Sequence, residues 1–240
     1  MPRFRPRQLV VAAIVLGVCA TWTAGLSARH QARQAQVWQH EGAELYWLLR
    51  RTYRDNRPMK LVDQLIRRHD RQQAVLELLA IQPGQVVADI GCGAGYYSFE
   101  LARLAGADGR VLAVDIDPAA IGFLEERAGR VPCPGCAGIE ATVSQVDDAT
   151  LPPASVDVAL VASLNFYAYR PLLPENLAML ASIHSALRPG GRAVVTLDLP
   201  FTPGGSAENM RISFEAAGFE TVDQRQHGDS SVVHVFRRPG

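Results

Sequence analysis

The feature that constrains the fold most is a regular alternation of short apolar runs with helical patterns between residues 86 and 236. Apolar runs with the length of buried strands lie at 86–90, 111–116, 139–146, 156–162 and 193–199, and helical patterns separate most of them, at 96–104, 118–128 and 174–187. Two more runs, 219–222 and 232–236, are expected to close the sheet as a hairpin. The alternation predicts an α/β domain with a doubly wound, mainly parallel, seven-stranded sheet that is covered on both faces.

The balance of charges argues against one class of partner. Lys plus Arg and Asp plus Glu are equal, at 24 each, and hydrophobic residues make up 48% of the 240 residues. The apolar share is enough for a sizeable core. No nucleic-acid partner is expected, because binding to phosphates needs a basic surplus.

The N-terminal region predicts contact with a membrane. Residues 9–26 form an apolar stretch, and Arg3, Arg5 and Arg7 precede it. This pattern predicts an N-terminal hydrophobic helix within residues 1–28, acting either as a signal peptide or as a membrane anchor. The protein is therefore expected to be membrane-anchored or exported, in the inner membrane or periplasm if its source is bacterial. The leading arginines favour a cytoplasmic N-terminus, but Arg29 and Arg33 weaken the bias, so the side of the membrane stays open.

Two further segments complete the predicted organisation. Residues 29–60 are arginine-rich and amphipathic, and they are interpreted as a connector that lies either on the membrane interface or on the domain. The domain itself is expected to occupy residues 61–240. Its first helix is predicted to start at a capping box formed by Asp70 and Gln73 and to stop at Pro83-Gly84.

The cysteines predict no metal site. Cys133 and Cys136 form a single Cys-x-x-Cys motif, and one such pair cannot complete a tetrahedral zinc site. A local disulfide and two free thiols are equally compatible with the motif.

The sharpest functional signal is the segment Asp89-Ile90-Gly91-Cys92-Gly93-Ala94-Gly95-Tyr96, which follows a predicted strand and precedes a predicted helix. Its glycines allow a tight turn and a close approach of backbone to a ligand. The spacing is Gly-x-Gly-x-Gly, whereas dinucleotide-binding loops would carry their third glycine at position 96. Asp115 ends the next strand, where a carboxylate can accept hydrogen bonds from ribose hydroxyls. Asp89 suits a ligand with an ammonium group and would repel a pyrophosphate.

With these features the chain resembles the class I S-adenosylmethionine-dependent methyltransferases over about residues 70–222. The matching segments are VADIGCGAGYYS, VLAVDIDP, the run from Asp147 to Pro152, the run from Val156 to Val158, and LRPGGRAVV. The resemblance implies a Rossmann-like fold and S-adenosyl-L-methionine as the cofactor. Within the class the chain looks closest to small-molecule methyltransferases of the ubiquinone or arsenite type, and its Gly-x-Gly-x-Gly-Tyr motif is also similar to isoaspartyl methyltransferases.

The resemblance also implies roles for particular residues. The methionine part of the cofactor would lie on a loop that comprises Asp89, Gly91, Cys92, Gly93 and Gly95. The nucleoside part would meet Asp115 at the ribose, Ile116 on the adenine ring, and Asp148 with Ala149 at the adenine edge.

Methyl transfer from a sulfonium is an in-line displacement, so the protein mainly has to align the reactants and exclude water. No obligatory catalytic residue is therefore expected. The segment 163–169 follows the fourth strand and offers aromatic and polar groups to a small-molecule acceptor. Asn165 and Tyr167 are the candidates for positioning the acceptor or for catalysis, and Tyr96 and Asp198 are weaker substrate-binding candidates. Packing in a lid explains the same aromatic residues equally well.

Several other polar residues have structural interpretations. Asp117 before Pro118 is expected to cap a helix, Asp157 is expected to be structural, and His184 is expected to be a surface or core residue. Pro189-Gly190-Gly191 is expected to form a turn before the fifth strand.

Two alternatives to an active methyltransferase follow from the sequence. A non-catalytic S-adenosylmethionine-binding or scaffold protein would keep the same fold, and export to a compartment poor in this cofactor would favour it. A nicotinamide-dependent oxidoreductase is disfavoured by the glycine spacing. The sequence makes no prediction of oligomeric state.

Overall fold

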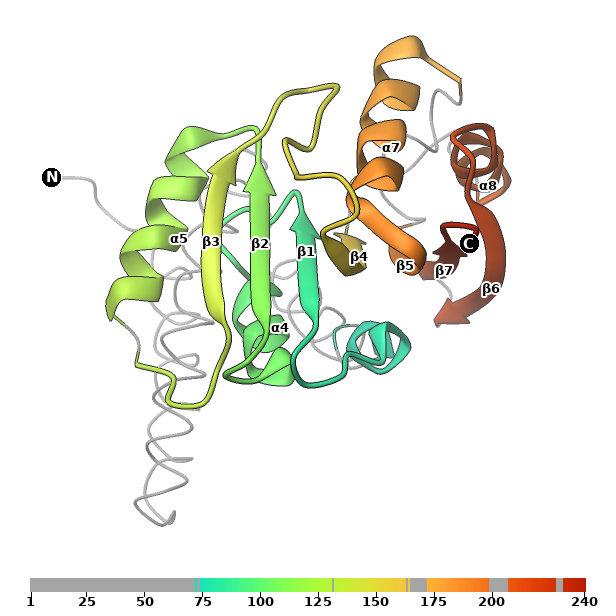
Figure 1. Ribbon diagram of the computed structural model, residues 1–240. Coiled ribbons are helices and arrows are strands. Elements are labelled where there is room, and N and C mark those ends of the chain that lie inside the picture. Colours follow the sequence, from blue (N-terminus) through green and yellow to red (C-terminus); the bar gives the residue numbers. More distant parts are fainter. Residues whose placement is uncertain are drawn as a thin grey trace, which may run out of the picture. The chain divides into compact units, whose positions relative to one another are not determined.

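Seven strands form one sheet in the computed structural model, in the order β3-β2-β1-β4-β5-β7-β6 (Figure 1). The structure describes residues 72, 74–130, 132–162, 164, 172–198, 207–227 and 231–240. The predicted signal or anchor segment, the connector, the domain boundary near residue 61 and the capping box lie outside these ranges, as do Asn165 and Tyr167. Within the described ranges, the helices are all too short or too polar to cross a membrane.

The sheet is mainly parallel, as the sequence predicts. Five strands run parallel, namely β1 (Val86–Ile90), β2 (Arg110–Asp115), β3 (Gly138–Val143), β4 (Val156–Ala162) and β5 (Leu187–Asp198). The expected closing hairpin is also present, as β6 (Glu220–His227) paired antiparallel with β7 (Ser231–Arg237), and β7 lies antiparallel to β5. The chain adds strands on one side of β1 up to β3 and then continues with β4 on the other side. The topological switch point therefore lies between β1 and β4.

Helices cover both faces of the sheet. The crossover helices α4 (Ser98–Ala105) and α5 (Pro118–Arg130) pack on one face, and α7 (Pro174–Ala186) and α8 (Ala207–Ala216) pack on the other. Successive residues of each strand point to opposite faces, so a strand covered on both sides is apolar throughout. In β2, Val111 belongs to the core beneath α4 and Leu112 to the core beneath α7. Residues 144–155, between β3 and β4, contain no helix.

Local sequence signals explain where two of these helices start or stop. The Asp117 side chain accepts a hydrogen bond from the Ala119 N–H at 2.9 Å, and Pro118 is the first residue of α5, so the predicted cap is confirmed. Gly106 follows the last residue of α4 with a φ of 69°, a conformation that ends helices and favours glycine.

The start of the fifth strand differs from the prediction. The strand begins at Leu187, six residues before the expected start at Ala193, and Pro189-Gly190-Gly191 forms an irregularity within it. Leu187 pairs with Val156, and the register then jumps so that Arg192 pairs with Val158. The Gly190 N–H donates to the Arg238 carbonyl at 2.9 Å, so pairing with the C-terminal segment keeps these residues in the sheet. Strand pairing outweighs the local turn signal here.

Two further residues with structural interpretations, Asp157 and His184, behave as expected. The Asp157 carboxylate accepts a hydrogen bond from the Val86 N–H at 2.8 Å and forms an ion pair with Arg188. His184 packs edge to face against Phe219, with ring centroids 5.0 Å apart. Both arrangements connect elements of the core.

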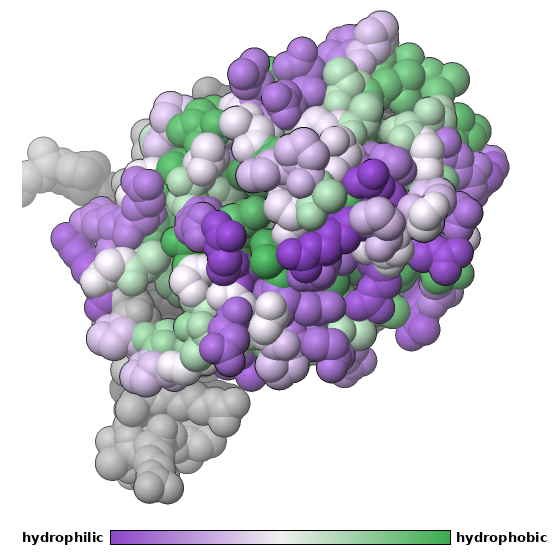
Figure 2. All heavy atoms as spheres, in the orientation of Figure 1, coloured by the Kyte–Doolittle hydropathy of each residue, from purple (hydrophilic) through white to green (hydrophobic). Residues whose placement is uncertain are grey.

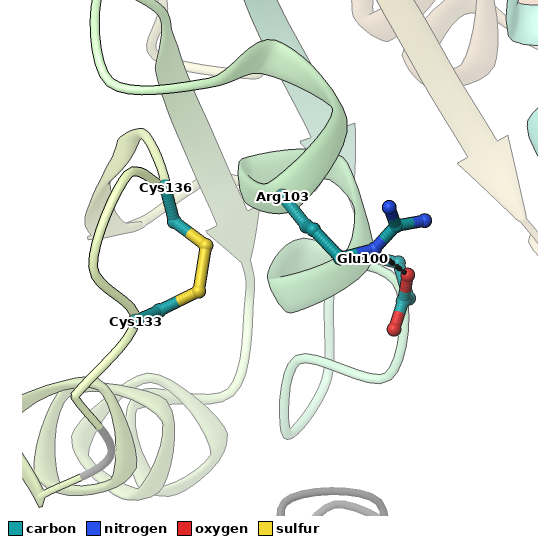
Figure 3. Close-up of a disulfide and its surroundings, with 4 residues drawn as sticks. All are labelled: Glu100, Arg103, Cys133 and Cys136. Carbon is teal, nitrogen blue, oxygen red and sulfur yellow. Dashed lines mark hydrogen bonds and ion pairs between the residues drawn. A yellow bond between two sulfur atoms is a disulfide. The ribbon is translucent and has the colours of Figure 1, made fainter. Parts of the chain in front are cut away.

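Cys133 and Cys136 form a disulfide in the loop between α5 and β3 (Figure 3). The Cys136 N–H donates to the Cys133 carbonyl at 3.0 Å, and Gly135 has a φ of 82°, so the four residues form a tight turn. The next residue, Ala137, donates its N–H to the Ala102 carbonyl of α4 at 2.9 Å. Of the two possibilities that the sequence left open, the structure has the disulfide.

Candidate functional site

The carboxyl ends of β1 and β2 carry the glycine loop and Asp115, side by side. Because the two strands are parallel neighbours, Ile90 pairs with Val114 and the segments that follow start at the same edge. The Gly91 and Cys92 N–H groups both donate to the Val114 carbonyl, at 2.8 and 3.0 Å. The glycine loop is thus attached to the end of β2 by backbone bonds.

The three glycines of the loop adopt left-handed backbone conformations but have different surroundings. The φ angles are 73° at Gly91, 54° at Gly93 and 88° at Gly95. A Cβ at Gly91 would lie 2.8 Å from Leu164 Cδ2, and a Cβ at Gly95 would lie 2.5 Å from Leu124 Cδ1. At Gly93 a Cβ would meet no atom of the described residues within 4 Å. The protein packs against both ends of the loop and leaves its centre open to a ligand.

Asp115 connects the centre of this loop to the start of α5. Its Oδ2 accepts a hydrogen bond from the Gly93 N–H at 2.8 Å, and its Oδ1 accepts one from the Asp117 N–H at 2.9 Å. A carboxylate has about four acceptor positions, so each oxygen can accept a further bond. The contact with ribose stays a prediction, and the bond to Gly93 is a feature that the sequence did not reveal.

Asp89 is buried beneath the loop, with 2% of its surface exposed. Its Oδ2 accepts a hydrogen bond at 2.7 Å from the hydroxyl of Ser98, the first residue of α4. Asp89 therefore links the strand before the loop to the helix after it. Its expected influence on the ligand through the loop stays a prediction.

Cys92 contributes backbone to the site but no reactive thiolate. Its side chain is buried in the core cluster that includes Ile121 and Leu124. Burial raises the pKa of the Cys92 thiol far above its ordinary value, and the nearby Asp89 carboxylate raises it further. The thiol therefore stays protonated at neutral pH and is a poor nucleophile.

An apolar surface lies next to Asp115. Ile116, which is expected to pack on the adenine ring, is 58% exposed. Val143, which pairs with Asp115 in the register of β2 and β3, and Val146 are also unusually exposed for large apolar residues. Sequence reasoning missed both valines, although the ends of parallel strands predict that Val143 lies beside Asp115. On the face in Figure 2, by contrast, hydrophilic and hydrophobic residues are intermixed.

Asp148 and Ala149 belong to a hydrogen-bonded network with α7. The Ser182 hydroxyl donates to Asp148 Oδ1 at 2.8 Å and accepts the Ala149 N–H at 2.9 Å. The Thr150 N–H, which also donates to Asp148 Oδ1, and the Ser182 hydroxyl lower the pKa of Asp148. Ala149 is fully buried in the core, so its side chain has no surface with which to meet an adenine. The contact between Asp148 and the adenine edge stays a prediction.

A polar cavity of about 420 Å³ adjoins Asp148. Its lining comes from the loop after β3 and from α7, and comprises Gln145, Asp147, Asp148, Leu151, Ala178, Ser182 and Ser185. Among the described residues, the glycine loop does not contribute to this lining.

The expected acceptor side of the site is described only in part. Of the segment 163–169 the structure describes Leu164, whose side chain reaches the glycine loop at Gly91. Tyr96 is partly buried and packs edge to face on Tyr97, with ring centroids 5.1 Å apart. Asp198 ends β5 and pairs with Ser231. The roles of Tyr96 and Asp198 toward an acceptor stay predictions, as do those of Asn165 and Tyr167. The described ranges contain no cluster of three or more side chains suited to a metal ion.

Comparisons with known proteins give two family matches within the chain and a similar fold. Residues 87–191 match a family described as "Methyltransferase domain", and residues 47–124 match "Protein-L-isoaspartate(D-aspartate) O-methyltransferase (PCMT)". The sheet and its helices resemble a SAM-dependent methyltransferase from Aquifex aeolicus, with a TM-score of 0.58 and 21% identity over 69% of this chain and 88% of that one.

Two curated relatives are similar over the same part of the chain. An arsenite methyltransferase of Halobacterium salinarum is 29% identical over 60% of this chain and 36% of the relative. A phosphoethanolamine N-methyltransferase of Triticum aestivum is 27% identical over 64% of this chain and 28% of the relative. The matched part thus spans about a third of these relatives.

Proposed function

We propose that this chain is a class I S-adenosylmethionine-dependent methyltransferase, which transfers the methyl group of S-adenosyl-L-methionine to a small-molecule acceptor. The match of residues 87–191 to a methyltransferase domain and of residues 47–124 to an isoaspartate methyltransferase supports this assignment, and the fold agrees with it. The observation that carries the proposal is the hydrogen bond between the Gly93 N–H and the Asp115 carboxylate. It joins the glycine loop to the end of β2, while no described residue fills the space beside Gly93.

The residues at this edge fit the cofactor chemically. The side of Gly93 that a Cβ would fill gives the methionine part close access to backbone, and Asp115 keeps acceptor positions for ribose hydroxyls. Ile116, Val143 and Val146 offer an apolar surface to an adenine ring. When bound, the cofactor supplies a methyl group that its positively charged sulfur activates for displacement.

The work left to the protein is alignment and exclusion of water. Leu164 places an apolar side chain against the loop at Gly91, next to the segment proposed to receive the acceptor. In that segment we assign Asn165 and Tyr167 to orientation of the acceptor, with Tyr96 and Asp198 as further contacts. The buried Cys92 thiol takes no part in covalent chemistry, because its raised pKa keeps it protonated.

Two relatives support a small-molecule acceptor, since their names give arsenite and phosphoethanolamine as substrates. The test is to incubate the full chain with cofactor carrying an isotopically labelled methyl group and a cell extract, and then to separate small molecules from macromolecules. We expect label in the small-molecule fraction. Label in protein alone would contradict the proposed acceptor class. Cofactor binding without any transfer would instead favour a non-catalytic binding or scaffold protein.

We also propose that residues 9–26 attach the chain to a membrane or direct its export. The apolar stretch with its leading arginines supports this, and the Cys133–Cys136 disulfide suits an oxidising compartment. A reporter that is active only outside the cytoplasm, fused to the C-terminus, determines the side: it is active if the domain is exported, and inactive but associated with the membrane if an anchored domain faces the cytoplasm. If deletion of residues 9–26 abolishes the reporter's activity or its association with the membrane, the proposal is supported. A fully soluble cytoplasmic fusion of the intact chain would contradict it.

A further inference from the structure

Arg127 is a charged residue that lies on the buried side of α5, against the glycine loop. Only 9% of its surface is exposed. Its Nη1 donates a hydrogen bond to the Ala94 carbonyl at 2.7 Å. Its guanidinium carbon lies 4.7 Å from the centre of the Phe99 ring of α4, a distance typical of cation–π contacts. The guanidinium thus links α5, the loop and α4.

A second side chain of α5 contacts the same part of the loop. Leu124 lies one helical turn before Arg127, on the same side of the helix. A Cβ at residue 95 would lie only 2.5 Å from Leu124 Cδ1, so Leu124 leaves no room for a larger residue there. The peptide that joins Ala94 to Gly95 is therefore held by packing at one end and by a hydrogen bond at the other.

The bond from Arg127 fixes more than one carbonyl. The Ala94 C=O and the Gly95 N–H belong to one planar peptide and point in opposite directions. The C=O accepts from Arg127, and the N–H donates to the Cys92 carbonyl at 2.9 Å. Orienting the carbonyl therefore also orients the N–H that closes the turn around Gly93. A guanidinium suits this task because its charge strengthens the bond.

We propose that Arg127 is a positioning residue for the cofactor: it holds the peptide between Ala94 and Gly95 and so sets the shape of the loop around Gly93. It acts through the loop, without contact to the ligand. The identity of that ligand rests on the proposed function, whereas the effect on the loop does not.

Three variants test this role. Arg127→Met removes the donor and the charge but keeps a long side chain near Phe99, and Arg127→Lys restores a cationic donor. Arg130→Met is the matched control, because Arg130 lies on the same helix but is exposed and paired with Glu126. Calorimetric titration with S-adenosylmethionine, at a temperature where circular dichroism shows all variants folded, gives the dissociation constants. We expect Arg127→Met to weaken binding roughly tenfold or more, Arg127→Lys to recover most of the loss, and Arg130→Met to stay within about twofold of the parent.

Amide hydrogen exchange of the ligand-free protein gives a readout that does not need the cofactor. We expect the Gly95 N–H to exchange roughly tenfold faster in Arg127→Met. The Gly91 N–H, which donates to Val114, is expected to be unchanged, and Arg130→Met is expected to alter neither. Lower thermal stability with unaltered Gly95 exchange and unaltered cofactor affinity would overturn the proposal and leave Arg127 as an ordinary core residue. If the parent chain bound no cofactor while Gly95 exchange responded as expected, the proposed function would fail and the positioning of the loop would stand.

Discussion

At the scale of single residues, two glycines of the loop serve different purposes, one toward a ligand and one toward packing. Gly93 has a left-handed backbone and no close neighbour for a Cβ among the described residues, whereas at Gly95, also left-handed, a Cβ would clash with Leu124. The first arrangement leaves room for a ligand, and the second lets α5 pack against the loop. A substitution at Gly95 therefore tests the packing of α5 against the loop, and a substitution at Gly93 tests the binding of a ligand.

We predict that Gly95→Ala destabilises the fold more than Gly84→Ala. Both residues have nearly the same φ, 88° and 85°, but a Cβ at Gly84 meets no described residue within 4 Å while one at Gly95 meets Leu124. Gly84→Ala should cost about 1–2 kcal/mol for the left-handed backbone. Gly95→Ala should cost about 1–3 kcal/mol more, because the methyl group overpacks the core. Urea denaturation measures both free energies of unfolding, and equal losses would show that Leu124 simply moves aside.

A second prediction concerns His234 and pH. This residue of β7 is fully buried and stacks on Phe236, and neither ring nitrogen has a hydrogen-bond partner within the described ranges. Burial lowers the pKa of His234 from 6.5 to about 4, with Arg211 lowering it further and Glu208 opposing the change. Between these values the unfolded chain binds a proton that the folded chain excludes, so stability falls as the pH drops from 6.5 toward 4.

The expected loss in the free energy of unfolding from this group is about 2 kcal/mol between pH 7 and pH 5. Urea denaturation at the two pH values measures it. His234→Leu should remove most of this pH dependence, and the part that remains includes His184, whose pKa is also lowered by burial. An unchanged difference between the two pH values in His234→Leu would contradict the assignment.

At the scale of elements, a disulfide closes the turn between α5 and β3. The Cys133–Cys136 disulfide spans four residues, of which Cys133 is exposed to solvent. In the chain-entropy account, a ring this small stabilises the fold by about 2 kcal/mol. We predict that replacing both cysteines by serine lowers the free energy of unfolding by about this amount.

The control for the disulfide is the parent protein in a dithiol reductant, which should lose the same stability. The Cys136 N–H bond to the Cys133 carbonyl and the Ala137 bond to α4 remain in both cases, so the fold itself should persist. If the parent were equally stable with and without reductant while mass spectrometry showed the disulfide opening, the turn would be held by these backbone bonds alone.

Periodicity predicted the elements best where one local signal was unopposed. β1 and β4 have the predicted bounds, and α5 begins at the predicted proline. The start of β5 was missed because Pro189-Gly190-Gly191 signals a turn, while pairing with Val156 and Arg238 draws these residues into the sheet. Such pairing is a long-range interaction that no local pattern records.

The site was predicted less completely than the fold, for a related reason. The glycine loop and Asp115 were found because their spacing after two parallel strands carries the signal. Arg127 was missed because an arginine on an amphipathic helix is usually solvated. Its spacing of three residues from Leu124, which is itself three residues from Ile121, would have placed it on the buried side of α5.

At the scale of the whole molecule, the topology brings the site together. The order β3-β2-β1-β4-β5-β7-β6 puts the switch point between β1 and β4, where parallel sheets bind ligands beyond the strand ends. The glycine loop follows β1, Asp115 ends β2 and Leu164 follows β4, so three segments distant in sequence meet at this edge. The proposed function therefore requires that this edge binds a sulfonium nucleoside through Asp115.

The most direct test is a calorimetric titration of the full chain with S-adenosylmethionine, compared between the parent, Asp115→Asn and Asp117→Asn. Asparagine at 117 can still cap α5, so this variant removes a neighbouring charge and keeps the fold. We predict binding by the parent and by Asp117→Asn, and a loss of roughly tenfold or more in Asp115→Asn, because an amide accepts fewer of the bonds from Gly93, Asp117 and the ribose. A folded parent that binds no cofactor at millimolar concentration, or an Asp115→Asn variant with undiminished affinity, would contradict the claim.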